Sequence, residues 1–140
     1  MNLLVPIVMI VASNVLYNLF TKTMPAGANP FAALVITYLT AGAVSFGMLL
    51  VTAQGDSAAA FRSINWTSAA LGASIVGLEL GYIYAYRAGW NISVCSLVAN
   101  IALAVILLFV GLLFFSEKLS LNQLIGIVLC VAGLFFLNRR

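Results

Sequence analysis

The chain has 140 residues, of which 64% are hydrophobic and only 6% are charged, and its formal net charge is +3. Soluble domains carry roughly 25% charged residues, so this chain lacks the polar surface that a soluble fold needs. It has no histidine, three acidic residues and two cysteines, which excludes zinc sites, Ser-His-Asp triads and disulfide scaffolds. We therefore predict an all-α integral membrane protein that is not an enzyme, uses no metal or cofactor and binds no nucleic acid.

Five apolar runs are long enough to cross the roughly 30 Å of bilayer hydrocarbon, which takes about 20 residues. We expect transmembrane helices at about 3–21, 31–53, 66–87, 92–115 and 120–138, in a single domain covering 1–140. The longest connection contains Ser57 to Phe61, where we expect a brief surface helix. No basic residue precedes the first run and no clear cleavage site follows it, so we interpret it as a span and not as a signal peptide.

The first predicted helix carries a polar stripe. Its members are Asn14, Tyr17, Asn18 and Thr21, at positions i, i+3, i+4 and i+7, a spacing that places side chains on one helix face. Such a stripe either lines an aqueous cavity or holds neighbouring helices together, and the spacing favours neither interpretation. The second predicted helix has a milder polar patch around Tyr38.

Small residues recur at every fourth position along the third predicted helix. The central members of this small-residue stripe are Ala73, Gly77, Gly81 and Ala85. Small side chains allow helix backbones to approach closely in a membrane, where lipid provides no hydrophobic drive for association. We expect the stripe to pack against another helix.

Glu79 is the acidic residue placed deepest in a predicted span. It follows Gly77 by two residues and so points about 200° away from it. Tyr82 and Tyr86 follow on the side of Glu79, about one and two turns later. An intramembrane carboxyl is costly and is a candidate for function, although a neutral acid that hydrogen-bonds a neighbouring helix is the structural alternative.

Two further features lie in the second half of the chain. Asn100 is the only strongly polar side chain within the fourth predicted helix, and it either faces a cavity or joins two helices. Arg87, Tyr84 and Trp90 stand near the end of the third helix and are typical of interfacial anchors. The alternative for Arg87 is binding of an anionic group.

A short series of motifs follows the fourth predicted helix. After the long fourth helix come Glu117, Lys118, Leu119, Ser120, Gln123 and Gly126. This order resembles the EamA-type half-domain of the drug/metabolite transporter superfamily, in which a Glu-(Lys/Arg)-Leu-(Ser/Thr) turn precedes Gln and Gly. Larger members of that superfamily have ten helices in two five-helix halves of inverted topology, with the substrate between the halves. The resemblance implies that this chain supplies one half-repeat.

The resemblance also implies a function. We expect a small secondary transporter that exports or exchanges a small organic metabolite or drug-like solute by alternating access in a homodimer. Glu79 would be the coupling or binding carboxyl, and the cavity candidates are Asn14, Tyr17, Asn18, Tyr82, Tyr86 and Asn100. Two alternatives stay open: a lipid-linked flippase subunit, and a non-transporting partner that stabilises a larger membrane assembly.

Basic residues at the span ends predict the orientation. With five spans, Lys22, Arg87, Arg139 and Arg140 lie on the C-terminal side, and Arg62 and Lys118 lie on the other side. This excess predicts a cytoplasmic C-terminus. We expect the chain to be a multi-pass protein of the cell (inner) membrane. The excess is small enough to allow insertion in both orientations, which favours an antiparallel homodimer.

Overall fold

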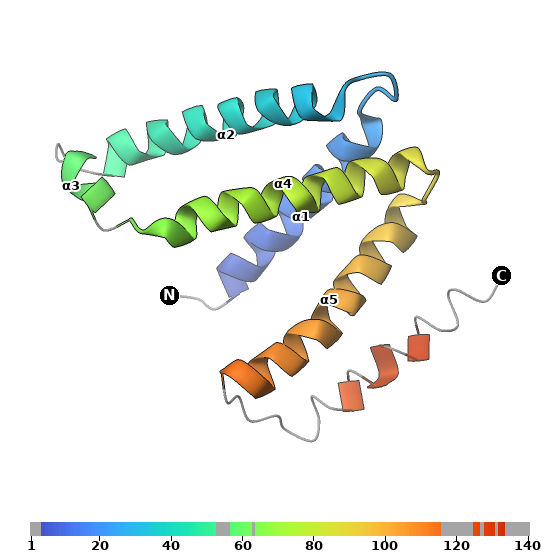
Figure 1. Cartoon of the computed structure of the whole chain (residues 1–140). Coiled ribbons are helices and arrows are strands. Elements are labelled where there is room, and N and C mark those ends of the chain that lie inside the picture. The colour runs from blue at the N-terminus through green and yellow to red at the C-terminus, as the bar shows by residue number, and fades with distance from the viewer. Residues whose placement is uncertain are drawn as a thin grey trace. The chain divides into compact units, whose positions relative to one another are not determined.

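The computed structural model describes residues 4–52, 57–62, 64–115, 125–126, 128–130 and 132–133. Its elements are α1 (Leu4–Thr23), α2 (Pro30–Thr52), α3 (Ser57–Arg62), α4 (Trp66–Arg87) and α5 (Ile92–Phe114), drawn in Figure 1. No strand occurs among these described residues, so the fold is all-α, as predicted. Four helices, α1, α2, α4 and α5, are long and apolar enough to cross a membrane.

The helix ends lie close to the predicted positions. The four long helices match the runs predicted at 3–21, 31–53, 66–87 and 92–115, and α3 covers the stretch predicted as a brief helix. The fifth predicted span, at 120–138, lies mostly outside the described residues, so the described residues contain four candidate spans where we predicted five. The described residues between 125 and 133 are helical.

Local side-chain chemistry explains where α2 and α4 begin. The Asn29 Oδ1 atom accepts hydrogen bonds from the backbone N–H groups of Phe31 and Ala32, at 2.9 and 3.3 Å. Pro30 then occupies the first helical position, where a missing N–H costs nothing. In the same way, Asn65 Oδ1 accepts from the backbone N–H of Thr67 at 3.0 Å. Asparagine is among the preferred residues for such caps.

The chain divides into two compact units. One unit consists of residues 1–19 and 89–140, and its long helices are the first part of α1 and all of α5. The other consists of residues 20–88 and contains the end of α1 together with α2, α3 and α4. Within this second unit, α2 and α4 are neighbours.

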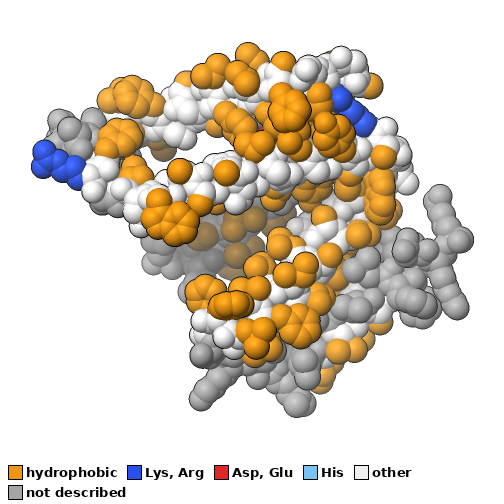
Figure 2. All heavy atoms as spheres, viewed as in Figure 1, with side chains coloured by type: hydrophobic (Ala, Val, Ile, Leu, Met, Phe, Trp, Pro, Cys, Tyr) orange, Lys and Arg blue, Asp and Glu red, His pale blue; other side chains and the backbone are white. Residues whose placement is uncertain are grey.

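Few side chains are buried in the described part of the chain. The buried residues other than glycine are Leu34, Ile83, Tyr86, Cys95 and the polar Asn18. Large apolar side chains are exposed along all four long helices, and Figure 2 shows many of them in orange. A hydrocarbon surface of this extent needs lipid or another helix to cover it, which agrees with a membrane-spanning chain.

Candidate functional site

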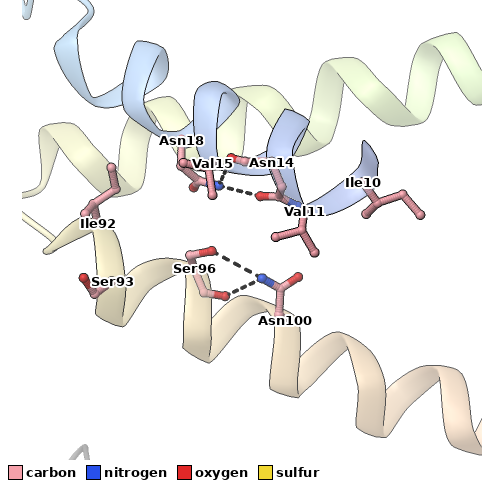
Figure 3. A pocket seen from close by; sticks show the side chains of 9 residues that line it. All are labelled: Ile10, Val11, Asn14, Val15, Asn18, Ile92, Ser93, Ser96 and Asn100. Carbon is pink, nitrogen blue, oxygen red and sulfur yellow. Dashed lines mark hydrogen bonds between the residues drawn. The ribbon is translucent and has the colours of Figure 1, made fainter. Parts of the chain in front are cut away.

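A cavity of about 490 Å³ lies within the unit made of residues 1–19 and 89–140. We call it the amide pocket, because its polar side chains are those of Asn14, Asn18, Ser93, Ser96 and Asn100. Its apolar wall consists of Ile10, Val11, Val15 and Ile92 (Figure 3). The volume lies in the range of small-molecule sites, roughly 300–1,000 Å³.

On the α1 side, two asparagines hold each other in place. The Nδ2 group of the buried Asn18 donates to the backbone oxygen of Asn14 at 2.8 Å and to its Oδ1 atom at 2.6 Å. The two residues are one turn apart, so α1 itself aligns them. The Nδ2 group of Asn14 has no acceptor among the described residues, so it can donate a hydrogen bond to a solute.

On the α5 side, Asn100 has the complementary arrangement. Its Nδ2 group donates to the backbone oxygen of Ser96 at 2.8 Å and to the Ser96 hydroxyl at 3.3 Å. The Oδ1 atom of Asn100 has no donor among the described residues. The pocket therefore presents an amide donor from α1 and an amide acceptor from α5, next to apolar side chains (Figure 3).

The described lining of the amide pocket contains no ionisable side chain. A charged solute that enters a low-dielectric site without a counter-charge loses more hydration energy than a few neutral hydrogen bonds return. A neutral solute that both donates and accepts hydrogen bonds meets no such penalty. The chemistry of the lining thus suits an uncharged, polar organic molecule with an apolar part.

The amide pocket unites three of the residues predicted to face a cavity, Asn14, Asn18 and Asn100. Tyr17 does not line it, since it lies about 100° around α1 from Asn18. The predicted cavity residues Glu79, Tyr82 and Tyr86 do not line it either, because they belong to the other compact unit.

Ser93 and Ser96 also line the pocket, although they were not predicted from the sequence. The sequence feature that could have identified them is their spacing: Ser93, Ser96 and Asn100 stand at i, i+3 and i+7, which is one face of a helix. Serine is common at helix–helix contacts in membranes. The two serines therefore indicate a pocket only when Asn100 has already been chosen as a cavity residue.

Glu79 has a partner that the sequence did not indicate. Its half-buried carboxyl interacts electrostatically with the hydroxyl of Tyr38 on the neighbouring helix α2. That hydroxyl is buried and makes no hydrogen bond of standard geometry to any described residue. This places a hydrogen-bond donor of α2 next to the Glu79 carboxyl of α4.

Tyr82 and Tyr86 follow Glu79 on α4 and pack on each other, with ring centroids 5.9 Å apart and ring planes inclined by 40°. The ring of Tyr86 is buried, and the Nζ atom of Lys22 lies 5.3 Å from its centroid. This geometry is that of a cation–π contact. The structure thus places the Tyr86 ring in a contact with the end of α1.

Comparison with known protein families identifies the family of this chain. The model of the EamA-like transporter family matches residues 2–139. The chain belongs to this family. No curated protein and no solved structure matches it.

Members of the EamA-like family are membrane transporters of the drug/metabolite superfamily, not enzymes. This EamA-like chain is accordingly a multi-pass membrane protein. The family assignment confirms the resemblance drawn from the sequence. The Glu117–Ser120 turn that suggested it lies outside the described residues.

The small-residue stripe of this EamA-like chain lies along α4. Gly77 and Gly81 are exposed, and nothing in the described structure lies within 4 Å of a Cβ atom placed on either. Ala73 is also exposed, whereas Ala85 is half-buried. The described part of one chain therefore supplies no partner for Gly77 and Gly81, and the expected close packing stays a prediction.

Proposed function

We propose that this EamA-like protein is a secondary transporter that exports or exchanges a small, uncharged organic metabolite or drug-like solute by alternating access. The amide pocket supports this proposal most directly. It combines the volume of a small-molecule site with an amide donor, an amide acceptor and an apolar wall. Asn14 and Asn100 would bind the solute, and Asn18 would orient Asn14. The proposal includes no chemical conversion of the solute.

Glu79 would couple transport to protons. Its carboxyl lies in the middle part of α4, and the hydroxyl of Tyr38 would donate a hydrogen bond to the ionised form. Because Glu79 does not line the amide pocket, the proposal assigns solute binding and proton binding to different residues. Alternating access would link the two events through helix movement.

The transporter would be a homodimer in the cell (inner) membrane, with an antiparallel arrangement as the simplest case. The exposed glycines of the small-residue stripe support a second copy as the missing packing partner. The small excess of basic residues on one side allows insertion in both orientations. In the more populated orientation the C-terminus would be cytoplasmic.

Purified protein in proteoliposomes with an imposed pH gradient tests the transport proposal. A panel of radiolabelled neutral amides and alcohols, each paired with the carboxylate or amine of the same shape, should show uptake of the neutral members. Accumulation should collapse when a protonophore removes the gradient. No uptake of any panel member, together with a requirement for a lipid-linked sugar, would favour a flippase subunit.

The dimer has its own test. Gly77→Leu places a bulky side chain on the small-residue stripe and should shift the detergent-solubilised protein toward monomer. Gly72→Leu, on α4 but outside the stripe, is the matched control and should remain dimeric. An Asn138→Cys label in a chain without Cys95 and Cys130 should react partly from each side of the membrane if the dimer is antiparallel. Reaction from one side alone would favour a parallel dimer.

A further inference from the structure

Helix backbone carbonyls fix the direction of two side-chain amides in the amide pocket. On α5, the backbone oxygen of Ser96 can only accept a hydrogen bond, so the Nδ2 group of Asn100 faces it, at 2.8 Å. The Oδ1 atom of Asn100 therefore points away from Ser96 (Figure 3).

The same rule applies on α1. The backbone oxygen of Asn14 can only accept, so the Nδ2 group of the buried Asn18 faces it, also at 2.8 Å. That Nδ2 group donates at 2.6 Å to the Asn14 side chain as well, and so meets its Oδ1 atom and not its Nδ2 group. The pocket thus has a donor of fixed direction on α1 and an acceptor of fixed direction on α5.

The donor of Asn14 and the acceptor of Asn100 are complementary, but they do not bond each other. Both residues line the same cavity, one from each side (Figure 3). No hydrogen bond joins these two described residues. A solute that bridges them needs an acceptor for Asn14 and a donor for Asn100.

The hydrogen bonds on the two sides run in the same direction. Asn18 donates to the oxygen of the Asn14 amide, and Asn100 donates to the backbone oxygen of Ser96. A solute amide that accepts from Asn14 and donates to Asn100 would complete a head-to-tail chain of amides. Hydrogen bonds in such chains strengthen one another, by roughly 10–30% per bond. An ester has no N–H group, so it would leave the Asn100 oxygen without a donor.

We infer that the amide pocket recognises a primary or secondary carboxamide group of its solute, with the C=O toward Asn14 and the N–H toward Asn100. The inference rests on the proposed transport of a neutral solute and adds the chemical group that is recognised. In a planar trans amide the C=O and N–H bonds point in opposite directions, which suits partners on two helices. A hydroxyl instead donates and accepts at a single oxygen. The apolar wall of the pocket would contact the rest of the solute.

Equilibrium dialysis of the detergent-solubilised protein with radiolabelled N-methylbenzamide tests this inference without transport. Unlabelled N-methylbenzamide should displace the label at about tenfold lower concentration than methyl benzoate, which has a similar shape but lacks the N–H group. The alcohol 2-phenylethanol should also displace the label less well than the amide does. These differences measure recognition of the amide group.

Two variants test the direction of the bound amide. Asn100→Leu should remove the preference for the amide over the ester, because the acceptor for the N–H group is gone. Asn14→Leu should weaken binding of both and retain most of the preference, because both carbonyls lose the same donor. Both positions are exposed in one chain, so leucine should be tolerated. Asn91→Leu is the matched control and should bind normally, since Asn91 makes no side-chain cap and does not line the pocket.

Other results would overturn the inference. Equal displacement by N-methylbenzamide and methyl benzoate, or no saturable binding of the labelled amide, would show that the pocket does not recognise this group. A preference retained by Asn100→Leu would place the N–H group elsewhere. Displacement by 2-phenylethanol at the same concentration as the amide would indicate a site for hydroxyl groups. If the amide binds as expected but proteoliposomes accumulate no solute, the transport proposal alone fails.

Discussion

The amide pocket and the unit of residues 20–88 use different kinds of polar group. Every polar side chain of the amide pocket is an amide or a hydroxyl. The other unit contains Glu79, which interacts with Tyr38, and the basic side chains of Lys22 and Arg87. Among the described residues, the neutral polar groups of the amide pocket and the ionisable groups Glu79, Lys22 and Arg87 therefore lie in different units.

The two kinds of polar group are also stabilised by different interactions. Asn18 and Asn100 each hydrogen-bond a residue one turn earlier on their own helix, so the helix largely satisfies them before any packing occurs. Lys22 and Arg87 instead lie at helix ends, close to water. Glu79 is stabilised in neither of these ways, because it lies within a span. Its carboxyl depends instead on the hydroxyl of Tyr38 on α2. Such a residue is costly to keep unless it has a function.

The largest expected effect is at Glu79. Glu79→Gln keeps the shape of the side chain and removes its titration, so accumulation driven by a pH gradient should be lost while solute exchange at equal pH continues. The measurement compares gradient-driven uptake with counterflow in proteoliposomes, with Glu79→Asp as the conservative variant that keeps a titrating group. If Glu79→Gln accumulates solute with an unchanged pH dependence, the carboxyl is structural and the separation of roles is wrong.

The next effect concerns the loop that Arg87 holds. Arg87→Gln removes the charged hydrogen bonds to the oxygens of Ala28 and Pro25, and should lower the free energy of unfolding by about 2 kcal/mol. Thermal unfolding in detergent provides the comparison. Arg62→Gln is the control of the same chemistry on α3, and should change stability by less than about 0.5 kcal/mol. Equal stability of the two variants would mean that Arg87 acts only as an interfacial anchor.

A smaller effect is expected at Asn100. Asn100→Ala removes one hydrogen-bonding group from the amide pocket and should raise the KM for a neutral solute about fivefold to tenfold, with stability nearly unchanged. Asn100→Asp should impair transport more, because it places a charge in a lining without a counter-charge. Leu103→Ala, an exposed α5 position outside the pocket, is the control. Better transport by Asn100→Asp than by Asn100→Ala would contradict a preference for neutral solutes.

The smallest effect on stability is expected at Tyr38. Its hydroxyl is buried without a hydrogen-bond partner of standard geometry in the described structure. Tyr38→Phe removes an unsatisfied group, and should leave the unfolding temperature unchanged or slightly higher. The same variant should shift the pH dependence of transport, because Glu79 loses its donor. A clear loss of stability with an unchanged pH profile would show that the hydroxyl is a packing group and not a partner of Glu79.

Span positions followed from the sequence because their causes are local. The apolar run length sets where a helix can cross the bilayer, and Asn29, Pro30 and Asn65 mark helix starts through bonds to residues only two or three positions away. The polar stripe with Asn14 and Asn18 was visible for the same reason, since neighbours at i+4 share a helix face. The family assignment rests on the sequence as well.

Pairings between helices could not be derived in this way. Nothing in the spacing of residues on α2 or α4 indicates that Tyr38 faces Glu79, that Arg87 reaches the α1–α2 loop, or that Lys22 covers Tyr86. Each depends on how helices distant in sequence are rotated and placed against each other. Many rotations bury similar apolar area on helices this hydrophobic, so the sequence pattern does not select among them. Only the tertiary structure distinguished the polar residues of the amide pocket from those next to charges.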